Sequence, residues 1–389
     1  MSRFIVVGAG PAGLSLALQL ARAGCSVDLV DASEQFSRQL RGDALMPCGQ
    51  EALARMGLLD RMMTLPQRSL EGWRVRVEGR LLFEVAEPMG SLQPCRLVPQ
   101  QLLLEDLLAQ AQTYPSFRWH GSETVQTLLR ESGRVSGVKL AGGEQLQGDL
   151  VVGCDGRSSL LRREAGIALN NQGNPLELLW FVLKGPIPEG CVWGFETLVR
   201  GGSIASACRS ATGDLQLAWL LEPGKPTPQH TPEAWAECFA AMGSPSLSEL
   251  LRERGDQLSK PLRLSVQVAM AERWQRPGLL LLGDAAHPMS PVRAQGINMA
   301  LRDSLVAAAL LAACGNHQAL DQATKQIERL RRPEVRRMQQ LQAAEARQGH
   351  LIGSSAALRA VLAMGSALAG PIAKRIWSAR QTPLREGIW

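Results

Sequence analysis

The sequence predicts an α/β fold: a Rossmann-type parallel sheet, interrupted by a mostly antiparallel sheet and followed by a helical C-terminal tail. Three observations support this prediction. A strand, a glycine-rich turn, a helix and a second strand open the chain, short alternating segments fill its middle, and four consecutive leucines near residue 280 restart a buried strand. At 389 residues the chain is longer than one hydrophobic core usually spans, so we expect two domains.

The opening unit is recognised from the order of its residue types. An apolar strand at residues 4–7 leads into the turn 8–13, which reads Gly-Ala-Gly-Pro-Ala-Gly. An apolar-periodic helix follows at residues 14–23, and the strand at residues 27–30 ends at Asp31. This is the order of the first βαβ unit in a dinucleotide-binding fold.

Each glycine of this turn has its own structural role. We expect Gly8 to make the tight turn, Gly10 to let a pyrophosphate approach the backbone, and Gly13 to let the helix pack closely on the strand. The helix N-terminus would hold the phosphates, and Asp31 would accept hydrogen bonds from a ribose diol. The residues predicted to contact the dinucleotide here are Gly8, Gly10, Pro11, Ala12, Gly13 and Asp31.

The middle of the chain predicts the second sheet. Residues 73–85 alternate around a turn at Glu78 and Gly79, which is typical of an antiparallel hairpin. Further short strands are expected at residues 178–183, 190–199, 203–208 and 215–221, followed by helices at 232–242 and 246–254. The dinucleotide-binding domain would then comprise residues 1–72, 97–175 and 265–345, and the substrate domain residues 73–96 and 176–264.

The tail, residues 346–389, is predicted to be helical. Its apolar stretch at 360–373 is broken by Gly365, Gly370 and Pro371, and is shorter than the ~20 residues that span a bilayer. The first strand begins almost at the N-terminus and leaves no room for a signal peptide, so we expect a cytoplasmic protein.

The amino-acid composition indicates which class of ligand the protein binds. The net charge is +6, but the arginines are spread among acidic residues, a pattern that favours small anionic ligands over nucleic acid. The eight cysteines are far apart and show no metal-ligand spacing, so we expect reduced thiols and no metal site.

Two further motifs extend the first one. Residues 150–161 place Asp155-Gly156-Arg157 after a strand, and residues 283–301 read GDAAHPMSPVRAQGINMAL. Together with the glycine turn, these resemble the three FAD motifs of class A flavoprotein monooxygenases, the p-hydroxybenzoate hydroxylase and ubiquinone-biosynthesis hydroxylase type. The resemblance implies a glutathione-reductase-type FAD-binding domain carrying an inserted substrate sheet. It also implies NADH or NADPH as reductant, O2, and hydroxylation of an aromatic or lipophilic substrate through a flavin C4a-hydroperoxide.

The resemblance also assigns cofactor contacts. It implies that Asp284 binds the ribityl chain of FAD, and that the turn before a helix near Gly296 points at the flavin ring, where the helix dipole favours negative charge. Arg41 and Gln100 match positions that contact the FAD phosphates and ribityl; the alternative is that Arg41 is a solvated loop charge and Gln100 only a helix-start residue. The remaining implied contacts are Asp155, Gly156, Gly283, Pro291, Gly296, Ile297 and Asn298.

Two residues are candidates for a catalytic role. His287 lies close to Asp284 and could act as an acid or base, but in similar proteins it packs beside the cofactor. Arg293 stands where the family more often has a small residue. It could hold an anionic substrate group, support the reduced flavin, or point to solvent or a surface carboxylate.

The substrate is only loosely bounded by the sequence. The single tyrosine, Tyr114, lies away from the motifs, so a tyrosine-assisted phenol deprotonation has no evident counterpart. Five aromatic residues on the predicted sheet could form core or accept a flat apolar substrate. They are Trp180, Phe181, Trp193, Phe195 and Trp219.

Two other functions remain open at this point. A geranylgeranyl-reductase-like protein would hydrogenate an alkene without oxygen. A non-catalytic flavin-binding protein would catalyse neither this hydrogenation nor a hydroxylation. Such a protein could contact anionic lipid through the tail, using Arg359, Lys374, Arg375 and Trp377. A flavin halogenase is disfavoured because the W-x-W-x-I-P signature is missing.

Overall fold

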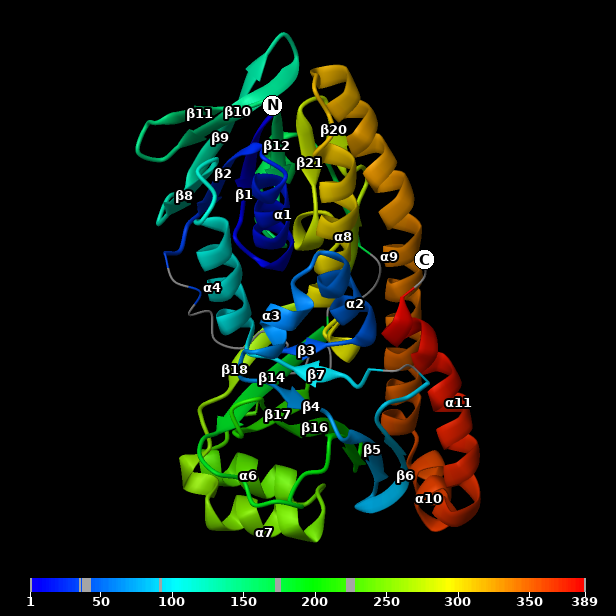
Figure 1. The fold of residues 1–389 in the computed structure, drawn as a ribbon. Coiled ribbons are helices and arrows are strands. Elements are labelled where there is room, and N and C mark those ends of the chain that lie inside the picture. The colour runs from blue at the N-terminus through cyan, green and yellow to red at the C-terminus, as the bar shows by residue number, and fades with distance from the viewer. Residues whose placement is uncertain are drawn as a thin grey trace.

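The computed structural model describes residues 2–34, 36, 43–90, 93–171, 176–221 and 228–387. Figure 1 shows two sheet-based layers along the length of the molecule, with the parallel sheet at one end and a seven-stranded sheet at the other. The long helix α9 (His317–Ser354) runs beside both of them. Arg41 falls outside the described residues.

The parallel sheet has the order β20-β21-β12-β1-β2-β8. All its neighbouring strands are parallel except the edge pair β20–β21. Its central strands are apolar runs buried on both faces, as parallel strands require. The strands are β1 (Arg3–Val7), β2 (Ser26–Asp31), β8 (Phe117–Gly121), β12 (Leu150–Gly153), β20 (Gln275–Arg276) and β21 (Leu279–Leu281).

Helices and a small sheet cover the parallel sheet. Helix α1 (Pro11–Arg22) packs between α4 (Gln100–Ala111) and α8 (Gln295–Leu311). A three-stranded sheet of β9 (Val125–Glu131), β10 (Arg134–Leu140) and β11 (Gln145–Gln147) contacts β12 through β10. The βαβ opening and the return of the parallel sheet at the leucine run are therefore as the sequence predicts.

The seven-stranded sheet has the order β18-β14-β17-β16-β15-β5-β6. The hairpin β5–β6 joins it through a parallel pairing with β15, and its other pairings are antiparallel. Helices α6 (Pro232–Ala240) and α7 (Pro245–Glu253) lie over one face (Figure 1). The strands are β5 (Gly72–Val77), β6 (Arg80–Ala86), β14 (Leu176–Leu183), β15 (Phe195–Arg200), β16 (Ser203–Arg209), β17 (Leu215–Leu220) and β18 (Leu262–Val266).

One predicted strand was too long. The strand expected at residues 190–199 begins only at Phe195, because the residues before it form a turn. Gly194 has φ +69°, and a Cβ there would lie 2.0 Å from the carbonyl oxygen of Gly72. Only glycine allows this close approach of two backbones, so β15 cannot extend further back.

Short elements connect the two large sheets. The strands β3 (Ala44–Leu45), β4 (Arg68–Ser69) and β7 (Arg96–Leu97) form one small sheet, and β13 (Leu169–Asn171) pairs with β19 (Ala269–Ala271). The short helices are α2 (Pro47–Arg55), α3 (Leu59–Met63), α5 (Leu160–Glu164) and the 3-10 turns η1 (Gly255–Gln257), η2 (Gly283–Ala285) and η3 (Val292–Ala294).

Three helices complete the chain. After α9 come α10 (Ala356–Met364) and α11 (Ser366–Glu386), which are bent by 106° relative to each other. Among the described residues, no single helix is long and apolar enough to cross a bilayer, and only α10 and α11 taken together reach that length and composition. Helix α9 begins at His317, well before the tail predicted to be helical at residues 346–389, and continues through Pro333.

Candidate FAD and substrate site

The turn between β1 and α1 accepts only glycine at two positions. Gly8 has φ +102°, and a Cβ there would lie 2.3 Å from the carbonyl oxygen of Cys154. A Cβ on Gly13 would lie 1.9 Å from the carbonyl oxygen of Gly8. At Gly10 a Cβ would meet no described atom within 4 Å, and no described side chain caps α1. The uncapped N–H groups at the start of α1 suit a pyrophosphate.

Asp31 lies beside this turn at the end of β2. Its Oδ2 accepts a hydrogen bond from the N–H of Ala9 at 2.7 Å, and its Oδ1 accepts one from Ser33 at 2.8 Å. Pro11 and Ala12 form the first turn of α1 at the same edge of the sheet. The carboxylate thus stabilises the turn and stands where a ribose is expected in this fold.

The second motif follows β12, which is the neighbour of β1 in the sheet. Oδ2 of Asp155 accepts a hydrogen bond from the N–H of Leu161 at 3.1 Å. Its Oδ1 is buried and has no partner among the described residues. Gly156 has φ +80°, and a Cβ there would meet no described atom within 4 Å. Because a buried acceptor without a donor costs free energy, Asp155 fits a contact with a ligand hydroxyl or N–H group, as FAD would supply.

The third motif begins where β21 ends. The N–H of Gly283 donates to Oδ2 of Asp303 at 3.1 Å, and Asp284 is partly exposed in the following turn. His287 is 1% exposed, its Nε2 lies 2.5 Å from Oδ2 of Asp303, and its ring packs 4.9 Å from that of Trp274. This interior position favours the packing interpretation of His287, and its acid–base role stays a prediction.

A buried network of charged side chains contacts the third motif. Arg331 of α9 donates from Nε to Oδ1 of Asp303 at 2.8 Å and also pairs with Glu334, and Arg302 lies 2.6 Å from Glu334. Burial alone would raise the pKa of Asp303, but the charges of His287 and Arg331 outweigh it and hold that pKa below its ordinary value. The network therefore ties α8 and α9 to the Gly283 turn.

Helix α8 starts without a side-chain cap. Its N-cap residue, Ala294, has the left-handed φ of 49°, and its side chain forms no cap hydrogen bond. A Cβ on Gly296 would meet no described atom within 4 Å, and Ile297 is buried behind it. Asn298 is used internally, because its Oδ1 accepts from the N–H of Met46 at 2.9 Å. The helix thus presents an uncapped, electropositive N-terminus, which fits the flavin end of FAD.

Arg293 pairs with a carboxylate of the protein, which comes nearest to the last of the roles considered above, and its roles toward substrate and flavin stay predictions. It follows Pro291 with φ 58°, and its guanidinium carbon lies 4.4 Å from the ring centre of Trp73 and 4.7 Å from that of Trp377. The guanidinium also forms an ion pair with Glu345 of α9, and its side chain is only 8% exposed. The charge of Arg293 is thus taken up inside the protein, between the third motif and the C-terminal helices.

Gln100 and Asp43 meet at the start of α4. The N–H of Gln100 lies 3.4 Å from Oδ1 of Asp43, which directly follows the undescribed segment containing Arg41. Asp43 was given no role from the sequence, although it stands in the polar loop where Arg41 was expected to bind FAD. Burial raises the pKa of Asp43 to about 6.

Asp43 connects the two halves of the site. Its carboxylate is hydrogen-bonded to the side chain of Gln216 on β17 of the seven-stranded sheet. The next residue, Ala44, accepts a hydrogen bond from Nδ2 of Asn298 at 3.2 Å, next to the N-terminus of α8. Asp43 is therefore a titratable group between the sheet and the expected position of the flavin ring.

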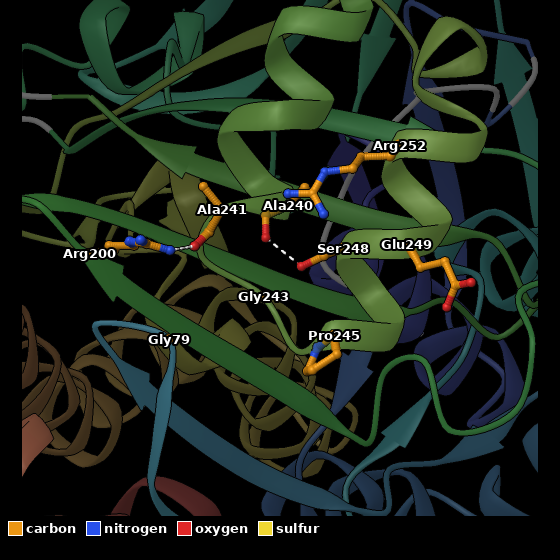
Figure 2. A pocket seen from close by; sticks show the side chains of 9 residues that line it. All are labelled: Gly79, Arg200, Ala240, Ala241, Gly243, Pro245, Ser248, Glu249 and Arg252. Carbon is orange, nitrogen blue, oxygen red and sulfur yellow. Dashed lines mark hydrogen bonds between the residues drawn. The ribbon is translucent and has the colours of Figure 1, made fainter.

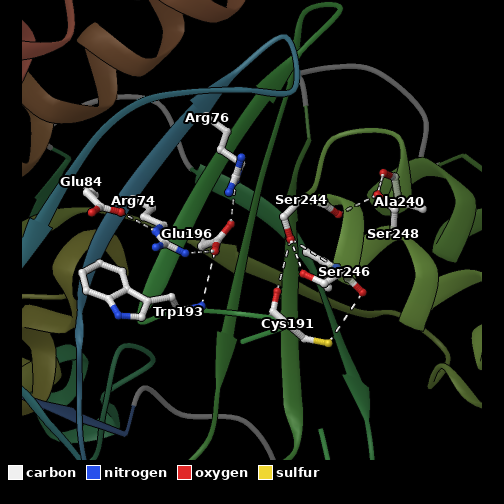
Figure 3. Close-up of polar contacts among 11 residues, drawn as sticks. Arg74, Arg76, Glu84, Cys191, Trp193, Glu196, Ala240, Ser244, Ser246 and Ser248 are labelled. Atoms are coloured by element: carbon white, nitrogen blue, oxygen red, sulfur yellow. Dashed lines mark hydrogen bonds and ion pairs between the residues drawn. The ribbon is translucent and has the colours of Figure 1, made fainter. Parts of the chain in front are cut away.

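The five aromatic residues of the sheet divide between its two faces. Phe181 and Trp219 point toward α6, where Phe181 packs 5.2 Å from Trp235, so both belong to the core. Trp193 precedes β15 and stacks under Arg74 at 4.4 Å. Trp180 and Phe195 lie on the opposite face, where Phe195 packs 5.4 Å from Trp73. Figure 3 shows how Glu196 fixes the Trp193 turn by accepting contacts from Arg74, Arg76 and the Trp193 N–H.

A surface hollow of ≈ 530 Å³ lies elsewhere (Figure 2). Its walls come from α6, α7 and the ends of β5 and β15, and none of the three motifs contributes to it. Figure 2 shows two of its polar side chains bonded to the backbone: Ser248 bonds to the carbonyl oxygen of Ala240 and Arg200 to that of Ala241. We therefore place the functional site at the motifs instead.

The three loops at the ends of β1, β12 and β21, facing a separate antiparallel sheet, define a dinucleotide-binding protein with a substrate sheet. The family model described as "FAD binding domain" matches residues 2–342, so the chain belongs to this family of FAD-dependent monooxygenases. It is 33% identical to 6-methylpretetramide 4-monooxygenase of Streptomyces rimosus over 92% of the chain and 87% of that protein. It is 30% identical to a ubiquinone hydroxylase of Rhodospirillum rubrum, over 85% of the chain and 77% of that protein.

Solved structures show the same fold. P. aeruginosa PqsL in complex with 2-aminobenzoylacetate matches with a TM-score of 0.78 and 20% identity, over 94% of this chain and 99% of that one. The p-nitrophenol 4-monooxygenase PnpA of Pseudomonas putida matches with a TM-score of 0.78 and 19% identity over all of both chains.

These findings decide between the functions left open by the sequence. The protein is an FAD-dependent monooxygenase that hydroxylates organic, often aromatic, substrates, with NAD(P)H as the reductant typical of its class. Both the alkene reductase and the non-catalytic flavin-binding protein are thereby disfavoured.

Proposed function

We propose that the substrate is a flat, largely apolar molecule, aromatic or otherwise lipophilic, bound between the seven-stranded sheet and the N-terminus of α8. Dioxygen and either NADH or NADPH serve as co-substrates. The relatives named for 6-methylpretetramide and for ubiquinone support a substrate of this kind.

The composition of one sheet face carries the proposal. The cross-strand row Trp180, Ala218, Ser206 and Thr197 lies on the face that also holds Gln216, the partner of Asp43. This row contains no charged side chain, and the indole N–H of Trp180 is buried without a partner among the described residues. Such a face suits an uncharged ring whose polar substituents accept one hydrogen bond.

The charges near the site agree with an uncharged substrate. The cation of Arg293 is neutralised by Glu345 and covered by two indole rings, so it is not available to bind a substrate carboxylate. Asp43 would repel a substrate anion once it is ionised. Uncharged polar groups remain on this face, among them the hydroxyls of Ser206 and Thr197 and the indole N–H of Trp180.

The residues of this chain contribute positioning and electrostatics. Bound FAD supplies the redox chemistry that activates oxygen at the expense of NAD(P)H. The N-terminus of α8 favours negative charge at its open end, and a substrate bound against the uncharged sheet face would displace water from it. The carboxyl group of Asp43 can hold or release a proton near pH 6, next to Gln216.

The proposal also covers where the protein works. We propose a cytoplasmic location and peripheral contact of the C-terminal tail with a membrane, from which a lipophilic substrate would be drawn. The exposed apolar side chains of α10 and α11 support this contact.

The direct experiment screens flat aromatic and quinone-like compounds with the purified FAD-loaded protein. A true substrate should accelerate oxidation of NADH or NADPH and consume oxygen. Anionic benzoates serve as the matched control class, because the proposal predicts that they stimulate much less than neutral rings. Stimulation by anionic compounds alone would contradict the proposed substrate class.

A further inference from the structure

Large apolar side chains on both sides of the bend between α10 and α11 are left exposed by the described chain. Five large side chains follow each other along it, with exposed fractions of 61% for Val361, 78% for Met364, 82% for Leu368, 64% for Ile372 and 45% for Ile376. The last three recur every four residues, so they lie on one side of α11. We call these five residues the bend face.

The opposite side of these helices is firmly packed. Trp377 is 8% exposed and lies 5.6 Å from the ring of Phe83 in β6. A Cβ on Gly370 would lie 2.3 Å from the carbonyl oxygen of Leu82, so α11 touches the backbone of β6. Arg359 on α10 donates to Glu78 at 2.6 Å. The bend face is therefore held outward by a rigid underside.

The charged side chains that α10 and α11 carry beside the bend face are all cations up to residue 385. Residues 346–385 contain no aspartate or glutamate. Exposed cations, Lys374, Arg375 and Arg380, follow the apolar residues on α11, and Arg347 is exposed on α9. Apolar residues at the bend with cations beyond them have the composition of a helix that lies in the interface of an anionic bilayer.

We infer that the bend face docks the protein on an anionic lipid surface, with the α10–α11 bend inserted among the acyl chains and the cations at the headgroups. The 106° bend makes the pair an interfacial element, because neither helix alone passes as a membrane span. A second copy of the chain fits the face less well, since pairing it with itself would bring cations together without acidic partners.

The docked orientation would place the site near the lipid. Trp377 on the underside of α11 stacks on Arg293, so one helix separates the bend face from the loop that precedes α8. In this respect the inference rests on the proposed function, because a lipophilic substrate would pass from the membrane to the site. Docking itself does not depend on which substrate is hydroxylated.

The test is flotation of the full-length, FAD-loaded protein with vesicles. One set contains phosphatidylcholine alone, and the other contains about one-quarter phosphatidylglycerol. We expect binding to the anionic vesicles, weakened by high salt. Leu368→Ser with Ile372→Ser should lower the bound fraction about tenfold, and Lys374→Gln with Arg375→Gln should remove the preference for anionic lipid. The matched control, Leu330→Ser, changes a 53% exposed leucine on α9 outside the face and should bind as the wild type.

Three outcomes would overturn the inference. The wild type could remain unbound with both kinds of vesicle, the Leu330→Ser control could lose binding as much as the bend-face variant, or the bend-face variant could instead convert a dimer into a monomer by sedimentation. Substrate-stimulated NAD(P)H oxidation measured without vesicles separates this inference from the proposed function. It should be unchanged in the bend-face variant, whereas a failure of the proposed function would abolish it in the wild type while flotation persists.

Discussion

Arg293, in the third FAD motif, holds its guanidinium carbon 4.7 Å from the ring centre of Trp377, in the last helix of the chain. The same helix accepts a hydrogen bond from Gln295 at the carbonyl oxygen of Leu384, at 2.7 Å. Residues 293 and 294 both have left-handed backbone angles, which cost free energy unless surrounding contacts hold them. The C-terminal helix therefore stabilises the loop from which α8 and its open N-terminus begin.

Trp377→Ala should weaken this support. The indole is nearly buried, so its removal should lower the free energy of unfolding by about 3 kcal/mol and also reduce FAD retention. Trp377→Phe keeps an aromatic face for Arg293 and should lose less of both. Chemical denaturation and the FAD dissociation constant measure the two effects. Unchanged FAD affinity in Trp377→Ala would mean that α11 does not support the cofactor loop.

Arg293 should affect the stability of the protein through the loop that precedes α8 and through its ion pair with Glu345. Arg293→Ala leaves the Glu345 carboxylate without its cation and should cost about 2–3 kcal/mol of unfolding free energy, whereas Arg293→Ala combined with Glu345→Gln should recover part of it. The flavin reduction potential and substrate affinity of the single variant test the sequence-based hypothesis. If neither changes, Arg293 has no role in cofactor or substrate binding, and its function is confined to stability.

Gly13→Ala should yield a protein that does not retain FAD. The added Cβ would lie 1.9 Å from the carbonyl oxygen of Gly8, so the turn that faces the pyrophosphate must move. Gly142→Ala is the control, since a Cβ there meets no described atom within 4 Å. The absorbance ratio of flavin to protein after purification gives the result, and a yellow Gly13→Ala protein with full FAD content would contradict this account of the turn.

Asp43 should make stability depend on pH in a particular direction. Its folded-state pKa of about 6 lies above the ordinary value of 3.8, so the folded protein binds the proton more tightly than the unfolded chain. The contribution of Asp43 to stability should therefore be greatest below its ordinary pKa and fall as pH rises to about 6, by up to about 3 kcal/mol. Above about pH 6 the carboxylate is ionised in both the folded and the unfolded protein, so this contribution to the unfolding free energy does not change further.

Asp43→Asn isolates this contribution. The variant should lack the loss of stability between about pH 4 and pH 6, so its unfolding free energy relative to wild type should be more favourable at neutral pH than in acid. Denaturant unfolding of both proteins across this range provides the comparison. A difference between them that does not vary with pH would show that Asp43 titrates normally.

Local patterns were enough to predict most of the framework. The glycine turn, the alternating hairpin and the leucine run each depend on neighbours in sequence, and the structure places all three as expected. Period-two alternation puts the neighbours Phe181 and Trp180 on opposite faces of the sheet, but it could not say which face α6 covers. The structure packs Phe181 into the core under α6 and leaves Trp180 on the other face.

The contacts of Arg293 could not be found in this way. Its carboxylate partner Glu345 is 52 residues away on another helix, and no spacing rule connects them. Asp43 was overlooked for a related reason. Burial raises its pKa, against the opposing effect of the hydrogen bonds from Gln100 and Gln216, and this burial depends on how the two halves of the protein pack.

The most direct test of the whole account uses isotopically labelled dioxygen. The FAD-loaded protein is incubated with NADH or NADPH and a compound that stimulates their oxidation, and the product is analysed by mass spectrometry. The account predicts a product that carries one labelled oxygen atom, formed only when oxygen is present. An unlabelled product, or a hydrogenated one that forms equally well without oxygen, would contradict it.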